Sequence, residues 1–175
     1  ALSCISSCSS RCPWCRSMRP EAGGREFLPD RRFMEAALAL AEEAYAAGEI
    51  PVGAVVVKDG AVIGRGRNRR EASRSVLGHA ELEAMEQAAA SLGDWRLSGC
   101  TLYVTLEPCP MCAGAAVNAH VERIVYGAED EVMGACGTAV SVIRLPRAFR
   151  PALYKGLLGE ECGALLRRFF AERRK

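Results

Sequence analysis

Four residues in two short motifs are of the types that bind a catalytic metal ion and move protons. His79 and Glu81 stand in the run HAE, and Cys109 and Cys112 stand in the run PCPMC. Zinc favours thiolate and imidazole ligands, and a catalytic zinc site uses three protein ligands and keeps a fourth position for water. We therefore predict that His79, Cys109 and Cys112 bind one zinc ion per subunit.

Glu81 is predicted to be the catalytic proton carrier of this site. It lies two positions after the histidine in the run HAE. A glutamate so placed can lie beside the bound water without being a ligand itself. From there it can take a proton from the water and return it to the reacting molecule. The pattern therefore indicates a hydrolytic site.

Other interpretations of these motifs have to be weighed. A single C-x-x-C motif is also typical of one half of a structural zinc knuckle or of a redox pair, and an isolated histidine is usually an ordinary polar residue. No second C-x-x-C motif lies nearby to complete a four-cysteine site, and thioredoxin-like surroundings are lacking. The joint pattern, with Glu81 and Pro108 both in place, favours the catalytic site.

Local signals place both motifs at helix starts. Proline is preferred at the first position of a helix, so Pro110 predicts that Cys109 caps a helix and that Cys112 lies in its first turn. The partial positive charge of a helix N-terminus lowers a thiol pKa and favours the thiolate. His79 is predicted to open a second helix in the same way, because apolar residues recur at helical spacing after it: Leu82, Met85, Ala89 and Leu92.

The remaining elements alternate between helices and strands. Asp30 is predicted to cap a helix that ends at Gly48, with Phe33, Ala37, Leu40 and Ala44 on one face. Strands are expected over residues 52–57, 101–106 and 123–126. A further strand is expected to follow the turn at residues 59–60 and to run through Ile63. Residues 65–74 are expected to form an arginine-rich loop. A terminal helix is expected with one packed face: Cys162, Leu165, Leu166, Phe169 and Phe170.

This alternation predicts the fold class. Strands that alternate with helices indicate an α/β protein, here a three-layer α/β/α sandwich with a central sheet covered on both faces. The run at residues 52–57 is almost wholly apolar, as expected of a strand buried on both sides. In such folds the site lies at the ends of strands. We expect the zinc ligands there.

Size and charge set limits on the class of protein. The chain has 175 residues and a net charge of +2, and it is long enough to bury roughly 70% of its unfolded surface in one domain. The small charge neither requires nor excludes a polyanionic partner. No run of about 18 apolar residues occurs, so we expect no membrane partner and a cytoplasmic protein. We place the zinc-dependent domain at residues 26–175.

Residues 1–25 are predicted to be a disordered leader rich in cysteine and serine. The first 20 residues hold six serines, three arginines and no acidic residue. Organellar import is possible on that composition, and so is an extension from an upstream start. The spacing of Cys8, Cys12 and Cys15 also occurs in radical iron–sulfur enzymes, but no later segment resembles their domain. We expect that deletion of the leader leaves folding, zinc content and activity unchanged.

The remaining cysteines are interpreted separately. Cys4 belongs to the leader, where its role is open. Cys100, Cys136 and Cys162 stand singly within apolar elements, so we expect them to be small buried hydrophobic residues.

From about residue 33 onward the chain resembles the bacterial tRNA-specific adenosine deaminases. The H-x-E and P-C-x-x-C motifs are typical of zinc-dependent base deaminases in general, a class that includes this family. The finer resemblance rests on these further segments: PVGAV at residues 51–55, GRN at residues 66–68, WRL at residues 95–97, TLYVTLEPCPMCAGA at residues 101–115, GACG at residues 134–137 and residues 161–170.

The resemblance implies a fold, an activity and further site residues. It implies a cytidine-deaminase-like fold with a mixed central sheet, a homodimer, and deamination of the wobble adenosine in a tRNA anticodon loop to inosine. Asn68 is then expected to hydrogen-bond the flipped base, the Ala80 backbone to read its edge together with Glu81, and Asp130 to meet the RNA sugar-phosphate. Free cytidine deaminases are expected to have cysteine in place of His79.

The sequence also departs from that family at positions linked to RNA. The family usually has DPTA where this chain has SVLG at residues 75–78, a lysine in place of Val132 and an arginine in place of His120. The Asn-His dipeptide expected near residues 149–150 is missing.

Three functions stay open on the sequence alone. The first is a tRNA adenosine deaminase, the second is a deaminase of a free base such as guanine or cytosine, and the third is a zinc-stabilised binding protein without catalysis. The presence of Glu81 argues against the third. The basic last helix and a group of arginines favour a polyanionic substrate, although either could be an ordinary solvated surface: Arg65, Arg67, Arg69, Arg70 and Arg74.

Overall fold

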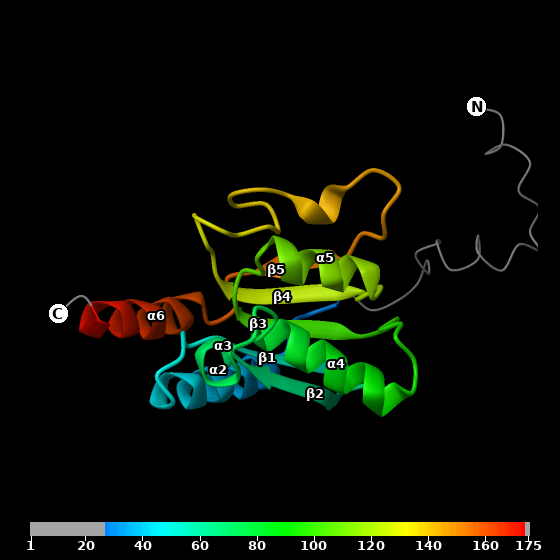
Figure 1. The fold of residues 1–175 in the computed structure, drawn as a ribbon. Coiled ribbons are helices and arrows are strands. Elements are labelled where there is room, and N and C mark those ends of the chain that lie inside the picture. The colour runs from blue at the N-terminus through cyan, green and yellow to red at the C-terminus, as the bar shows by residue number, and fades with distance from the viewer. Residues whose placement is uncertain (1–26, 174–175) are drawn as a thin grey trace, which may run out of the picture.

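The computed structural model describes residues 27–173, so the predicted leader and its cysteines lie outside the described residues. A mixed sheet of five strands forms the middle layer, in the order β2-β1-β3-β4-β5 (Figure 1). Strands β2, β1 and β3 pair antiparallel, and β3, β4 and β5 pair parallel. The strands are β1 (Gly53–Lys58), β2 (Ala61–Arg67), β3 (Thr101–Leu106), β4 (Arg123–Ala128) and β5 (Ala152–Lys155).

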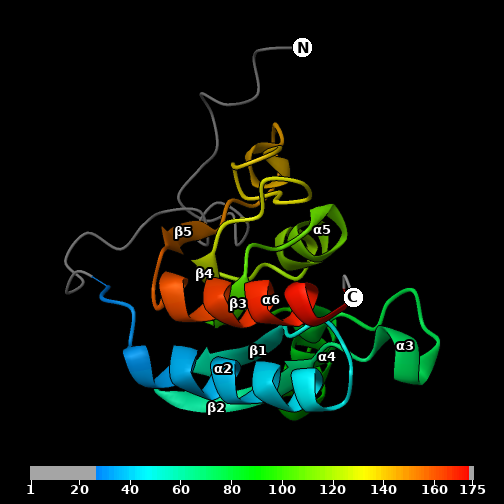
Figure 2. The same ribbon diagram turned by 90° about the vertical axis from the view of Figure 1, so that its left-hand side faces the viewer.

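Helices cover both faces of this sheet. The helices are α2 (Arg31–Ala46), α3 (Arg70–Ser73), α4 (Ala80–Leu92), α5 (Pro110–Asn118) and α6 (Gly159–Arg173), with a single 3-10 turn at Val142–Arg144. Helices α2 and α6 lie side by side on one face, and α4 and α5 lie on the other (Figure 2). The predicted α/β/α sandwich is therefore confirmed.

Strand β1 shows why its sequence is almost wholly apolar. Successive side chains of a strand point to opposite faces of the sheet. Val55 and Val57 pack in the core under α2, whereas Ala54 and Val56 pack in the core under α4 and α5. Both faces of the strand are buried from Ala54 to Val57, so these positions need apolar side chains.

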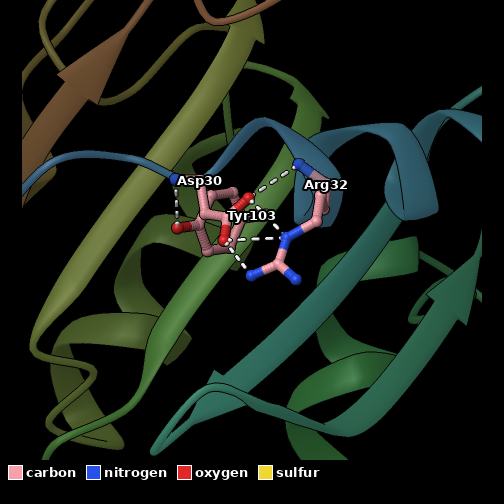
Figure 3. A network of polar contacts seen from close by, with 3 residues as sticks. All are labelled: Asp30, Arg32 and Tyr103. Atoms are coloured by element: carbon pink, nitrogen blue, oxygen red, sulfur yellow. Dashed lines mark hydrogen bonds and ion pairs between the residues drawn. The ribbon is translucent and has the colours of Figure 1, made fainter.

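Asp30 caps the start of helix α2, as predicted. The Asp30 carboxylate accepts a hydrogen bond from the Arg32 backbone N–H at 2.9 Å and pairs with the Arg32 guanidinium at 2.6 Å (Figure 3). The Asp30 backbone N–H donates to the Tyr103 hydroxyl at 3.1 Å. The hydrogen bonds from Arg32 hold the pKa of Asp30 below its ordinary value. Because Tyr103 lies on β3, these contacts tie the helix start to the middle of the sheet.

Helix α4 lies unusually close to the edge strand β2. A Cβ atom added to Gly66 would come within 2.1 Å of the Ala80 carbonyl oxygen, which is far closer than any real contact. Glycine at this position therefore lets the first turn of α4 rest directly on the backbone of β2. This close approach fixes the position of the residue before α4, which is His79.

The structure corrects several predicted boundaries. Strand β2 continues past Ile63 to Arg67, and α3 follows three residues later, so residues 65–74 are not a single loop. Strand β5 was not predicted, because it is short, partly exposed and defined by its pairing with β4. On α6 only Cys162, Leu165 and Phe169 are buried, and Phe170 is 44% exposed because α6 packs on the sheet along a narrow stripe.

Candidate active site

The three predicted zinc ligands lie together at the starts of two helices. His79 is the N-cap of α4, and Cys109 is the N-cap of α5, with Pro110 at its first position. The His79 Nδ1 atom lies 3.7 Å from the Cys109 Sγ atom and 3.6 Å from the Cys112 Sγ atom. All three ligand atoms lie within 4.8 Å of one another.

This geometry fits a tetrahedral zinc ion. Zinc bonds of about 2.3 Å to sulfur and about 2.0 Å to nitrogen, at tetrahedral angles, put a nitrogen and a sulfur ligand about 3.6 Å apart. Neither N-cap side chain is engaged in a capping hydrogen bond, so the His79 imidazole and the Cys109 thiol are available as ligands. The donor set of one imidazole and two thiols provides three ligands, which is the number typical of a catalytic zinc site.

The thiols of Cys109 and Cys112 differ in pKa. Hydrogen bonds from the Cys112 thiol and from His79 lower the pKa of Cys109 to about 4. The pKa of Cys112 is raised, because its thiol hydrogen-bonds Cys109 and is buried beside it. The hydrogen bond with Cys109 also raises the pKa of His79. Cys109 is thus held as a thiolate, the form that binds metal.

Glu81 lies in the first turn of α4 with its carboxyl buried beside the ligands. Its side chain is only 4% exposed. Burial raises the pKa of the Glu81 carboxyl to about 6, since a charged carboxylate is poorly solvated there. A group that titrates near neutral pH can both accept and release a proton, as an acid–base catalyst must.

A cavity of about 510 Å³ opens in front of these residues. Its volume lies within the range of about 300–1,000 Å³ that is typical of small-molecule sites. Its wall is partly apolar, with Ile50, Val52, Leu106 and Met111. The end of β3 and the starts of α4 and α5 meet at this cavity, so the predicted location at strand ends is confirmed.

The three residues expected to bind substrate all line this cavity. Asn68 and Ala80 are buried, and Asn68 is fixed by its backbone N–H, which donates to the Val52 carbonyl at 3.0 Å. Asp130 also lines the cavity, and its carboxylate accepts hydrogen bonds from the backbone N–H groups of Val132 and Met133. The structure therefore brings these residues to the zinc ligands, and their roles stay predictions.

The residues at which the chain departs from the family are not among those that line the cavity. Val132 lies two residues after Asp130 and is 81% exposed, and Val76 is 82% exposed. His120 lies beyond the far end of α5 from Cys109, about 14 Å along a helix of nine residues. Its ring stacks on Phe149 with centroids 5.0 Å apart. The replacement of arginine by His120 therefore does not alter the cavity wall.

The arginines near the site do not form one free basic surface. Arg70 lines the cavity, but Arg69 pairs with Glu83 at 3.1 Å and Arg67 pairs with Glu43 at 3.7 Å. On α6, Arg168 and Arg173 lie over aromatic rings, with centroid distances of 4.5 Å to Tyr45 and 4.2 Å to Phe169. Arg70 is thus the arginine of the predicted group that lines the cavity.

The three internal cysteines are buried, as predicted. Cys100, Cys136 and Cys162 are at most 5% exposed. Burial raises the pKa of Cys136 to about 12 and that of Cys162 to about 11, so both are protonated thiols at neutral pH. These cysteines are packing residues.

Sequence reasoning missed part of the cavity wall. Glu107 and Met133 line the cavity but were not among the residues singled out from the sequence. Glu107 had a usable signal, because an acidic residue that directly follows an apolar strand and precedes the metal motif is expected to be buried near the site. Met133 lies in an irregular segment with no periodic pattern. Only the folded chain places it there.

Comparison with known proteins finds similarity to tRNA adenosine deaminases and to a guanine deaminase. A family model described as MafB19-like deaminase matches residues 29–170. The tRNA-specific adenosine deaminase of Bacillus subtilis (strain 168) is 46% identical over 147 residues, which is 83% of this chain and 91% of that protein.

Two solved structures share the fold. One, from a study of A-to-I editing by tRNA:A34 deaminases at the wobble position of transfer RNA, is 42% identical and has a TM-score of 0.76; the match covers 78% of this chain and all (100%) of that one. A guanine deaminase from Nitrosomonas europaea is 28% identical with a TM-score of 0.73, over 84% of this chain and 87% of that one. Among the described residues, no helix is both long and apolar enough to cross a membrane.

Proposed function

Since this chain belongs to the family of tRNA-specific adenosine deaminases, we propose that it converts the wobble adenosine of a tRNA anticodon loop to inosine. The reaction is a hydrolysis, in which water adds to the carbon that bears the amino group and ammonia leaves. The observation that carries the proposal is that His79, Cys109 and the buried Glu81 line one cavity, with Cys112 completing the ligand cluster beside it. The identity of 46% with the Bacillus subtilis enzyme supports the choice of substrate.

His79, Cys109 and Cys112 would hold one zinc ion per subunit. A zinc ion there supplies Lewis acidity, which lowers the pKa of water to about 7 and so provides the nucleophile at neutral pH. The backbone positions these three side chains, because α4 rests directly on β2 and the buried residues of α5 share one core with those of β3. The close packing of α4 on Gly66 holds His79 in place.

Glu81 moves the protons of the reaction. Its carboxylate takes a proton from the attacking water and delivers protons to the adenine ring nitrogen and to the departing amino group. Its burial serves this role in two ways. The pKa of about 6 keeps proton transfer in both directions accessible, and the cavity wall limits exchange with bulk water.

Asn68, the Ala80 backbone and Asp130 are proposed to bind the substrate. A deaminase can reach its target atom only in a base that has left the stack, and a loop base costs less to extrude than a paired base. Asn68 and Ala80 lie deep in the cavity, where they can hydrogen-bond the edge of adenine. Asp130 and Arg70 lie on its wall, where they can meet the sugar-phosphate of the same strand.

The anticodon stem-loop of a tRNA is the proposed partner, and the chain is proposed to act as a homodimer in the cytoplasm. The support for the dimer is the resemblance to the family. Light scattering of the purified protein measures it directly, and a monomer mass at all concentrations that support activity would refute it.

One assay tests the proposed function. The protein is incubated separately with a synthetic anticodon stem-loop bearing adenosine at the wobble position, with adenosine, with guanine and with cytosine, and ammonia release is followed. We expect turnover of the stem-loop alone, and inosine in the recovered RNA. Turnover should fall as salt rises, because RNA binding releases counterions. Fast, salt-insensitive turnover of guanine or cytosine, with no inosine in the RNA, would refute the proposal.

A further inference from the structure

Glu107 is a buried carboxylate in the cavity wall that the proposed reaction does not use. Its side chain is only 2% exposed, and it lies between the end of β3 and Cys109. A charge so placed needs compensating partners, because burial of an unpaired carboxylate is costly. Glu107 finds these partners in backbone N–H groups.

Three backbone N–H groups of one segment donate to this carboxylate. The Glu107 Oε2 atom accepts from Asp130 at 3.2 Å, and the Oε1 atom accepts from Cys136 at 2.9 Å and from Thr138 at 3.2 Å. We call residues 130–138 the rim segment. It has no helix or long strand of its own to satisfy these donors, so Glu107 replaces the missing backbone partners.

The rim segment carries part of the cavity wall. Asp130 and Met133 both line the cavity. The segment also packs tightly on Glu107, because a Cβ atom added to Gly134 would lie 2.5 Å from the Glu107 Oε2 atom and 2.4 Å from the Asp130 carbonyl oxygen. The position of this wall is therefore set by the contact between the Glu107 carboxylate and the backbone of residues 130–138.

A carboxylate suits this role better than an amide. Two oxygens of Glu107 face three N–H donors, and each oxygen accepts at least one of them. In either orientation, the amide group of a glutamine would turn an NH2 donor toward at least one backbone N–H. A buried donor left without an acceptor is destabilising, so the segment would move away.

We propose that Glu107 is a positioning residue for the substrate. It holds the rim segment so that Asp130 and Met133 stand ready at the cavity before RNA binds. This inference rests on the proposed function for the identity of the substrate. Glu107 orders residues 130–138 in the free protein. The free energy of substrate binding then does not have to offset the entropy cost of ordering them.

A second buried carboxylate, that of Glu49, offers a matched comparison. Glu49 is also 2% exposed, and its carboxylate accepts hydrogen bonds from the backbone N–H groups of Glu71 at 3.2 Å and Ala72 at 2.7 Å. These contacts hold α3, which carries Arg70. Glu49 and Glu107 therefore have equal burial and similar partners, but they hold different segments.

The experiment compares the variants Glu107→Gln and Glu49→Gln. In Glu107→Gln, the backbone amides of Asp130, Cys136 and Thr138 should exchange with solvent at least about 10-fold faster, while those of Glu71 and Ala72 keep their rates. In Glu49→Gln, the backbone amides of Glu71 and Ala72 should exchange faster, while those of Asp130, Cys136 and Thr138 keep their rates. Residue-resolved amide exchange by NMR measures both. A uniform increase in both variants would indicate general loss of stability and would overturn the proposal.

Kinetics on the anticodon stem-loop supply the second measurement. We expect Glu107→Gln to raise KM about 10-fold, the effect of losing a hydrogen bond to a charged group, with a smaller fall in kcat and a full complement of zinc. Zinc content that falls in step with activity would overturn the proposal, because Glu107 would then support the metal site. Unchanged KM would overturn it as well.

A second variant keeps the test decisive if Glu107→Gln does not fold. Gly134→Ala should displace the rim segment from the other side and raise KM in the same way. Gly114→Ala on α5 is its control, because a Cβ atom there meets nothing within 4 Å. Equal KM values for the two variants would overturn the proposal.

The proposed function and this inference can fail separately. Wild-type protein that releases no ammonia from the stem-loop refutes the proposed function. The amide exchange rates need no substrate, so they decide independently whether Glu107 orders residues 130–138.

Discussion

The floor of the cavity and its rim are built in different ways. The floor consists of His79, Glu81 and Cys109, which line the cavity, together with the buried ligand Cys112 next to them. All four lie at or within the first turn of α4 or α5. The rim consists of α3 and residues 130–138, which are held by the buried carboxylates of Glu49 and Glu107. Regular backbone therefore positions the predicted zinc ligands and Glu81, and single side chains position the surface that we propose meets the substrate.

This difference suggests how the family can vary its substrates. The floor matches the motif of zinc-dependent base deaminases at every position, whereas Val132, a departure from the adenosine deaminases, lies within residues 130–138 of the rim. A change at the rim leaves the starts of α4 and α5 undisturbed. Changes in the floor should thus abolish the reaction, and changes in the rim should alter affinity.

The largest effect is expected from Cys109→Ala. Loss of one of three ligands should remove zinc, and the deamination rate should fall at least about 10³-fold because water is no longer activated. Metal analysis and ammonia release measure the two losses together. Cys162→Ala is the control: it removes a buried thiol from the core under α6, so it should keep zinc and activity at a cost of about 1 kcal/mol in stability. Activity that survives in Cys109→Ala would refute the ligand assignment.

Glu81→Ala should separate chemistry from metal binding. The variant should keep its zinc and lose turnover by about 10²-fold to 10⁴-fold, the usual contribution of an acid–base catalyst. Glu86→Ala, an exposed position on the same helix, should behave like the wild type. If zinc is lost from Glu81→Ala along with activity, then Glu81 supports the metal site and is not the proton carrier.

Gly66→Ala tests how firmly the floor depends on the sheet. The added Cβ atom would lie 2.1 Å from the Ala80 carbonyl oxygen, so the first turn of α4 must shift and carry His79 with it. We expect a loss of about 1–3 kcal/mol in stability and a fall in kcat of up to about 10²-fold from misplacement. Thermal unfolding and single-turnover rates measure these changes. A wild-type kcat in the folded variant would show that the floor does not depend on this contact.

The smallest effect is expected at the rim, from Val132→Lys. Val132 is 81% exposed, and the family usually has lysine there. A new phosphate contact should lower KM for the stem-loop a few-fold. It should also steepen the slope of log affinity against log salt concentration by about one. Leu28→Lys adds the same charge before the start of α2, about 24 Å of helix away from the cavity, and should leave KM unchanged. An equal fall in KM in both variants would mean that only net charge matters.

Much of the fold could be predicted because its signals are local. Asp30 caps α2, Pro110 begins α5, and residues 101–106 form a strand with the predicted bounds. Each of these features depends on a few adjacent residues. Strand β5 and helix α3 escaped prediction because neither has a pattern of its own: β5 exists through its pairing with β4, and the first turn of α3 is held by Glu49.

The sequence by itself indicated the chemistry of the site, and the tertiary structure decided which distant segments complete the cavity. The types and spacing of His79, Glu81, Cys109 and Cys112 indicate a hydrolytic zinc site, since ligand chemistry and helix capping are both readable over a few residues. Met133 joined the cavity only through the contacts that Glu107 makes with the distant residues 130–138. Such contacts depend on the packing of the whole chain, and no local pattern encodes them.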